Sequence, residues 1–388
     1  MKNNPYQPRS VPPVLAGRDG QLLDFEEHAA PVIATGRAAQ SMPVLYGVRG
    51  VGKTSILRTA QQWAAENGFV TAWTSATKGE SLLESLPYAI EMAMEQTDVK
   101  PTKNWSAKKL TLKGGIAPFG AEVVLEPGEN APKQGAWNPS KLEMMLRESA
   151  NACAYRNGKR VGAGLLLIID ELHAAKRSDL GVLFNAVQHV IQDQLYPPPL
   201  MLLGAGLPDV RGIATISATF GERIDFVEVG MLSDNEVREA LEKPALQLGA
   251  KFEPRALDLL VEQSANYPFF VQLFGFHTWR AAAGPNQITY ADAQSGVKTA
   301  REKVLDMYAA RWGATSTAER KFLETLATLG GDMPVERSLI AAELGQTTQG
   351  ISSIRDRLIN KAVIAEAKRG FLQFTLPGFA DYVLNELR

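Results

Sequence analysis

The chain has 388 residues, of which 45% are apolar and 21% are charged, and its formal net charge is −1 at pH 7. This length allows two or three domains with sizeable cores, and the composition is ordinary for a globular protein. A near-neutral charge excludes a protein that coats polyanions over its whole surface, although it leaves room for a local basic patch. The single Cys153 excludes an internal disulfide, and the four histidines do not cluster at metal-ligand spacing, which argues against a metal hydrolase.

The N-terminus carries no recognisable targeting signal. Residues 1–13 are polar and proline-rich, and no apolar run elsewhere approaches the length of a membrane span. We therefore expect a cytoplasmic protein without a membrane partner.

Residues 47–55, Gly-Val-Arg-Gly-Val-Gly-Lys-Thr-Ser, have the spacing G-x-x-x-x-G-K-[ST] of a phosphate-binding loop. The loop follows an apolar run at 44–46 and precedes a helix expected at 54–67. Glycines at 47, 50 and 52 permit positive φ angles and let backbone N–H groups surround a phosphate, and Lys53 adds a positive charge. The Thr54 hydroxyl is placed to bind Mg²⁺. The alternative is a glycine-rich turn without a ligand. The predicted nucleotide contacts here are Gly47, Val48, Arg49, Gly50, Val51, Gly52, Lys53, Thr54 and Ser55.

A continuous apolar run at residues 165–169 ends in Asp170 and Glu171. Such a run indicates a buried central strand of a parallel sheet, at whose carboxyl end ligands bind. We expect Asp170 to hold Mg²⁺ through water and Glu171 to polarise the attacking water. The alternative is that these acids merely begin a helix. His173 is interpreted as a helix-start residue and not as a catalytic group.

The rest of the first 231 residues alternates strands with helices. Strands are expected at 69–73, 200–203 and 225–229, and helices at 81–95, 140–155 and 179–195. This alternation predicts an α/β domain over residues 1–231, with a parallel sheet covered by helices on both faces. Two apolar stretches that flank a Gly/Pro-rich turn predict a β-hairpin insertion at about 105–130.

From Leu232 onwards the pattern is helical. A capping box from Ser233 to Glu236 begins the first of four helices, which we interpret as a lid domain over residues 232–313. A second capping box, Ser316 to Glu319, begins the last domain, residues 314–388. There, three helices precede a basic-tipped hairpin, which predicts a winged helix, a variant of helix-turn-helix.

The winged helix offers residue types that can contact phosphates or base edges. However, residues 316–388 contain nine basic and nine acidic residues. Binding to double-stranded DNA and a protein-interaction role therefore both stay open. The predicted DNA contacts are Gln349, Ser352, Ser353, Arg355, Arg357, Lys368 and Arg369.

Together these motifs resemble the AAA+ superfamily of ATPases, most closely the initiator clade of origin-recognition and cell-division-control ATPases and its bacterial relatives. The likeness rests on residues 15–18, on 47–54 as Walker A and on 169–171 as Walker B, and more faintly on 204–208, 220–223 and 267–270. It implies an α/β P-loop NTPase that binds ATP or ADP with Mg²⁺, with Gly17 and Arg18 at the adenine and ribose. It also implies self-association, in which Arg223 acts as an arginine finger on the neighbouring subunit; the alternative is an ordinary surface arginine or an internal ion pair.

Two departures from this family pattern stand out. The sensor-1 position usually offers a polar side chain to the γ-phosphate, whereas here the strand runs into Gly204, Ala205 and Gly206. The lid also shows no clear sensor-2 arginine where Tyr267 and Pro268 stand. A proline at position 268 resembles instead the pattern of the signal-transduction (STAND) ATPases. This likeness implies that Pro268 contacts the nucleotide.

The leading hypothesis is a Mg²⁺-dependent ATPase whose nucleotide state controls the lid and the winged helix, and through them DNA or a partner. One alternative is a STAND-type signalling switch that holds ADP and uses its winged helix to bind protein or as an internal clamp. Another is a scaffold that binds ATP without turnover. The chain has no Asn/Thr-Lys-x-Asp motif for reading guanine, which argues against a GTPase.

Overall fold

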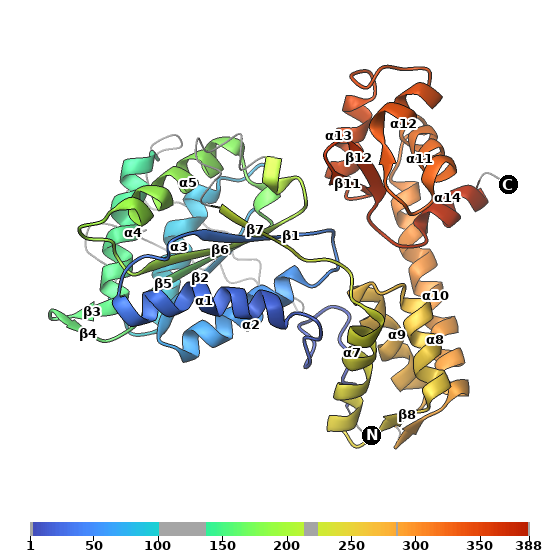
Figure 1. Ribbon diagram of the computed structural model, residues 1–388, viewed down its shortest axis with the longest axis horizontal. Helices are drawn as coiled ribbons and strands as arrows, with labels where there is room; N and C mark the ends of the chain where they lie inside the picture. Colours follow the sequence, from blue (N-terminus) through green and yellow to red (C-terminus); the bar gives the residue numbers. More distant parts are fainter. Residues whose placement is uncertain (1–2, 101–136, 213–223, 285, 387–388) are drawn as a thin grey trace, which may run out of the picture.

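The computed structural model describes residues 3–100, 137–212, 224–284 and 286–386 (Figure 1). An α/β part, a helical lid and a small C-terminal domain follow one another along the chain. The hairpin insertion predicted at about 105–130 and the predicted arginine finger Arg223 lie outside the described residues.

A parallel sheet forms the centre of the α/β part, as predicted. Its strands lie in the order β2-β5-β6-β1-β7, and all neighbouring pairs are parallel. Strand β6 lies between β1 and β5, so the phosphate loop after β1 and the acids ending β5 meet at one edge of the sheet. The bounds are Met42–Tyr46 (β1), Phe69–Ser75 (β2), Gly164–Asp170 (β5), Leu200–Gly206 (β6) and Ile224–Glu228 (β7).

Helices cover both faces of this sheet (Figure 1). Because side chains alternate along a strand, Leu166 and Ile168 of β5 enter the core on one face while Leu165 and Leu167 enter the core on the other. The first face carries α1 (Asp19–Thr35) and α2 (Lys53–Glu66), and the second carries α3 (Leu82–Gln96), α4 (Pro139–Ala154) and α5 (Arg177–Gln192). Between α4 and β5 lies a short hairpin of β3 (Tyr155–Arg156) and β4 (Lys159–Arg160).

The lid begins with the predicted capping box. The Ser233 hydroxyl accepts from the Glu236 N–H at 3.4 Å, and the Glu236 carboxylate accepts from the Ser233 N–H at 2.6 Å. The helices are α7 (Asp234–Gln247), α8 (Pro254–Ser264), α9 (Pro268–Ala281) and α10 (Tyr290–Gly313), and β8 (Lys251–Phe252) pairs with β9 (Gln287–Ile288). Among the described residues, no helix is both long and apolar enough to cross a membrane.

The N-terminal segment packs on the lid, an arrangement that the sequence did not indicate. Tyr6 is only 1% exposed, and its hydroxyl donates to the Leu241 carbonyl on α7 at 2.5 Å. The Gln7 N–H donates to the Gln272 side chain on α9 at 3.0 Å. These contacts hold the start of the chain against the lid.

The C-terminal domain has the predicted winged-helix order. Its antiparallel sheet has the order β10-β12-β11, and Phe322, Leu326 and Leu358 are fully buried in its core. Figure 1 shows α10 leading directly from the lid into this domain. The elements are α11 (Thr317–Gly330), β10 (Val335–Glu336), α12 (Arg337–Glu343), α13 (Ser352–Asn360), β11 (Ile364–Lys368), β12 (Phe371–Phe374) and α14 (Phe379–Glu386).

Candidate nucleotide site

The predicted phosphate loop connects β1 to α2. Gly50 and Gly52 have φ angles of 78° and 98°, in the left-handed region that favours glycine. Gly47 does not have a positive φ, so that part of the prediction was wrong. Its reason for being glycine is space, because a Cβ at this position would lie 2.2 Å from the Val229 carbonyl oxygen.

Lys53 is the first residue of α2, and its ammonium group turns back into the loop. Its Nζ donates to the carbonyl oxygens of Gly47 at 2.7 Å and Val48 at 2.9 Å. The residue is 8% exposed, and burial lowers the pKa of Lys53 to about 8, although Glu171 and Asp170 nearby oppose this shift. The loop therefore holds a cation that a phosphate can attract away from the two carbonyls.

The structure brings together Thr54 and Asp170, the two residues predicted to bind Mg²⁺. The Thr54 hydroxyl donates to Asp170 Oδ2 at 2.7 Å, and Asp170 Oδ1 accepts from the Glu171 N–H at 2.8 Å. Within the described ranges, no group of three or more His, Cys, Asp or Glu side chains could hold a metal ion. One hydroxyl and one carboxylate suit Mg²⁺, which takes its other ligands from water and substrate phosphates.

Glu171 directly follows β5 and lines the same space as Lys53. Its φ is 55°, and its side chain is 38% exposed. One carboxylate oxygen, Oε2, lies 3.3 Å from Nε2 of His173. His173 belongs to a single 3₁₀ turn, Leu172–Ala174, so the two acids end a strand and do not begin an α-helix.

Lys53, Thr54 and Glu171 line one cavity of about 620 Å³, a volume typical of small-molecule sites. Its lining comes from parts of the chain that are distant in sequence: the loop residues 49–55, Glu171, the N-terminal residues 7–12, and Pro268 and Phe269 of α9. Sequence reasoning missed the N-terminal contribution, because a polar, proline-rich start carries no local pattern that indicates a site.

Arg18 and Gly17 lie next to the loop and the lid. The Arg18 guanidinium, 4% exposed, donates to the carbonyl oxygens of Val51 at 3.0 Å and Gly230 at 2.7 Å, and the residue lines the cavity. Gly17, with a φ of 66°, lies against α7, where a Cβ would approach the Glu236 carboxyl carbon to 2.5 Å. Arg18 thus supports the loop's backbone, and the contact of both residues with a nucleotide stays a prediction.

Tyr267 joins the lid to the phosphate loop. Its hydroxyl donates to the Arg49 carbonyl oxygen at 2.6 Å, and a Cβ on Gly50 would lie 2.0 Å from that hydroxyl. Arg311 on α10 lies in the same region: burial lowers its pKa, Tyr267 raises it and Arg49 lowers it. Arg311 is a basic residue near the loop that sequence reasoning missed, because it is one of many charges on a long helix.

The end of β6 has a steric reason for lacking a polar side chain. A Cβ on Gly204 would lie 2.4 Å from Leu172 Cδ1, and one on Gly206 would lie 2.9 Å from Val210 Cβ. Neither position accommodates a larger residue with its present neighbours. The departure from the usual sensor-1 pattern therefore follows from close packing at this edge of the sheet.

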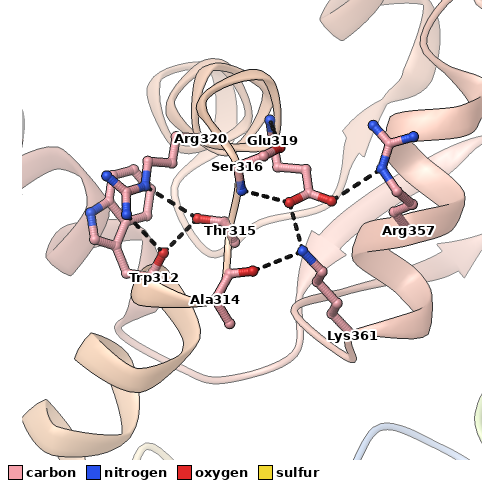
Figure 2. A network of polar contacts seen from close by, with 8 residues as sticks. All are labelled: Trp312, Ala314, Thr315, Ser316, Glu319, Arg320, Arg357 and Lys361. Atoms are coloured by element: carbon pink, nitrogen blue, oxygen red, sulfur yellow. Dashed lines mark hydrogen bonds and ion pairs between the residues drawn. The ribbon is translucent and has the colours of Figure 1, made fainter.

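Figure 2 shows a polar network in the winged helix that binds Arg357 of α13 and Lys361, the residue that follows this helix. Glu319 is 1% exposed and accepts from Arg357 Nε at 3.2 Å, Lys361 Nζ at 2.7 Å and the Ser316 N–H at 2.8 Å. Lys361 also donates to the Ala314 carbonyl at 2.8 Å. Burial opposes ionisation of Glu319, but its hydrogen bonds with Lys361 and Ser316 lower its pKa to about 2. Arg357, a predicted DNA contact, thus pairs with Glu319 through Nε while half of its side chain stays exposed.

The other predicted DNA contacts lie on α13, the turn before it and the wing. Arg355 pairs with Asp356 at 2.7 Å, and the Ser352 hydroxyl donates to the Thr348 carbonyl at 3.0 Å. Gln349, Ser353, Lys368 and Arg369 are exposed. Contact of any of these residues with DNA stays a prediction.

Comparisons with known proteins agree with this geometry. Residues 14–203 match the family described as AAA ATPase domain, and residues 305–383 match one described as Domain of unknown function (DUF8462). No curated protein matches the chain. Among solved structures, the Walker-type ATPase of Pyrococcus abyssi is 16% identical, with 99% of each chain covered and a TM-score of 0.58.

Two other similar structures have lower scores. Cdc6p from Pyrobaculum aerophilum is 12% identical, with 100% of this chain and 99% of that chain covered and a TM-score of 0.49. The RuvB Holliday junction branch migration motor of Thermotoga maritima is 15% identical, with 94% and 95% covered and a TM-score of 0.46. Identities this low show likeness of fold alone. Since the AAA ATPase domain covers the loop and both acids, residues 14–203 form a P-loop ATPase domain.

Proposed function

We propose that this AAA-domain ATPase is a Mg²⁺-dependent molecular switch that binds and hydrolyses ATP and passes its nucleotide state to the lid and winged helix. One observation carries the proposal. Lys53, the Thr54–Asp170 pair and Glu171 meet at one edge of the sheet, beside a cavity whose other walls come from the N-terminal segment and the lid.

The residues have separate tasks in this reaction. Lys53 and the loop N–H groups hold the phosphates, while Thr54 and Asp170 would hold Mg²⁺, which supplies charge neutralisation at the phosphate oxygens when bound. Glu171 accepts a proton from the water that attacks the γ-phosphorus. The bond from that phosphorus to the bridging oxygen breaks, ADP leaves with the electron pair, and the proton passes to inorganic phosphate. Arg223 keeps its proposed role as an arginine finger in a self-associated form.

Three contacts support coupling between the site and the C-terminal domain. The Tyr267 hydroxyl binds the loop at Arg49, so a change of loop conformation on nucleotide binding reaches α9. At the far end of α10, Lys361 binds the Ala314 carbonyl and Arg320 binds the Trp312 carbonyl at 3.4 Å (Figure 2). The lid helix and the winged helix are therefore held together, and we propose double-stranded DNA as the ligand of the winged helix.

The ATPase assignment is tested with three variants in a phosphate-release assay and an ATP-binding assay. Lys53→Ala should weaken ATP binding at least about tenfold, because it removes the cation at the phosphates. Glu171→Gln should bind ATP normally but lower kcat by about 10²- to 10⁴-fold, the usual contribution of a general base. The exposed Lys78→Ala is the matched control and should change neither quantity. Normal ATP affinity of Lys53→Ala, or a normal rate of Glu171→Gln, would contradict the assignment.

A second candidate is the STAND-type switch, in which the winged helix binds a protein or acts as an internal clamp. It is favoured by the internal ion pairs of Arg355 and Arg357, which engage two of the predicted DNA contacts. This candidate predicts that ADP stays bound through purification and that duplex DNA does not bind at low salt.

A further inference from the structure

His173 lies between the proposed catalytic base and the end of β6, and its side chain is 14% exposed. The backbone N–H of Leu207 donates to His173 Nδ1 at 3.2 Å, so this nitrogen is an acceptor. The proton of the neutral ring is then on Nε2, which lies 3.3 Å from Glu171 Oε2. Burial, together with the positive charges of Lys53 and Arg49, lowers the pKa of His173 to about 4, which keeps the ring neutral near pH 7.

This contact restrains a carboxylate that otherwise has freedom to rotate. Nε2 of His173 lies beside one oxygen of the Glu171 carboxylate, Oε2, and this side chain is 38% exposed, so it can accept from water. A general base works only when it lies within hydrogen-bond reach of the proton that it removes. A neutral imidazole can fix the carboxylate without supplying a positive charge that would lower its basicity.

The contact also joins Glu171 to the strand next to it. Strand β6 lies between the loop strand and the acidic strand, but its end carries Gly204 and Gly206, which cannot accept side chains beside Leu172 and Val210. The connection from β6 to the base therefore runs through the backbone of Leu207 and the ring of His173.

We propose that His173 is a positioning residue: its neutral ring, anchored on the Leu207 N–H, orients the Glu171 carboxylate toward the attacking water and couples it to the end of β6. The inference rests on the proposed ATP hydrolysis and deepens it. His173 does not line the cavity, so it acts through Glu171 and not through contact with the nucleotide.

Steady-state kinetics on the full chain test the role. His173→Leu should lower kcat about 10- to 100-fold, the scale expected from misplacing a catalytic group, with the KM for ATP changed by less than about threefold. His173→Gln keeps a donor near the place of Nε2 and should recover most of the rate. In Glu171→Gln, adding His173→Leu should cause no further loss, because the base that His173 orients is already absent.

The control is His189→Leu on α5, because His189 is also paired with a glutamate, Glu143, at 3.1 Å but lies elsewhere. The proposal is overturned if His173→Leu has the same kcat as His189→Leu. It is also overturned if the losses of kcat caused by His173→Leu and by Glu171→Gln multiply in the double variant. If His173→Leu does not fold, the ring-state measurement on the wild type and on Glu171→Gln decides.

The ring state is tested independently of activity. The chain has four histidines, so the imidazole nitrogens of ¹⁵N-histidine-labelled protein give a simple spectrum at pH 7.5. His173 should show the Nε2–H tautomer, and Glu171→Gln should shift its Nε2 resonance, whereas Glu143→Gln should not. The proposal is overturned if His173 carries its proton on Nδ1, or if its Nε2 resonance is the same in Glu171→Gln as in the wild type. Absence of phosphate release from the wild type would instead overturn the proposed function, and the tautomer would still report the contact.

Discussion

At the scale of single residues, the burial of Lys53 links nucleotide binding to pH. The ammonium is 8% exposed and its pKa is about 8, well below the usual lysine value of 10.5. Bound phosphate favours the charged form. Below pH 8 the free protein already carries that charge, whereas above pH 8 Lys53 is mostly neutral and must take up a proton on binding.

ATP affinity should therefore be constant from pH 6.5 to 7.5 and should fall as pH rises above 8, by up to about tenfold for each pH unit. Calorimetric titration in two buffers of different ionisation enthalpy measures both the affinity and the protons taken up. Lys53→Arg provides the control, because a guanidinium does not titrate in this range, and its affinity should show no such trend. A wild-type affinity that stays level up to pH 9.5 would show that Lys53 is not the phosphate cation.

At the scale of elements, the winged helix depends on one buried carboxylate. Glu319 caps α11 through Ser316 and binds Arg357 and Lys361 of the α13 region, so it fixes the angle between two helices (Figure 2). Its folded-state pKa of about 2 is below the usual 4.5. A lowered carboxylate pKa stabilises the fold fully above pH 4.5, and this stabilisation is lost as pH falls toward 2.

Glu319→Gln should lower the local stability of α11 and α13 by about 1–3 kcal/mol at pH 7, since it removes charge-assisted hydrogen bonds and weakens the cap. Amide hydrogen exchange of these two helices in the intact chain measures the effect. The difference from wild type should shrink as the pH is lowered below 4.5. Glu324→Gln, on the same helix, is the matched control; equal loss of protection in both variants would contradict the special role of Glu319.

At the scale of the whole molecule, the arrangement of the three parts connects nucleotide state with the winged helix. The lid lines the cavity through α9 and carries the C-terminal domain on α10 (Figure 1). Tyr267 and Arg49, whose contact joins lid and loop, lie 218 residues apart in the chain. A lid that responds to the loop would therefore move the winged helix as well.

If DNA is the ligand, duplex binding measured by fluorescence anisotropy should weaken steeply with added salt and should differ between the ATP-bound Glu171→Gln variant and the ADP-bound wild type. Arg369→Ala on the exposed wing should lower the affinity several-fold across duplex sequences and reduce the salt slope by about one. Arg238→Ala, which removes an arginine paired with Asp258 on the lid, is the control. No binding at low salt, with ADP recovered from the purified protein, would favour the STAND-type switch.

The sequence by itself determined the parts whose signals are local. The glycine and lysine spacing of the phosphate loop, the apolar run ending in Asp170 and Glu171, and the capping boxes at Ser233 and Ser316 each depend on neighbours within a few residues, so they could be predicted from order alone. The alternation of strands and helices likewise predicted the parallel sheet, the lid and the winged helix.

Only the tertiary structure decided which distant groups complete these parts. The N-terminal residues at the cavity, the Tyr267 bond to the loop, the close fit of Gly204 against Leu172 and the pairing of Glu319 with Arg357 all join segments far apart in the chain. His173 has the same character: its position near Glu171 is visible in the sequence, but its ring state is set by the N–H of Leu207, which follows strand β6. Such contacts depend on how the surfaces of distant segments pack together, so the spacing of residues along the chain does not predict them.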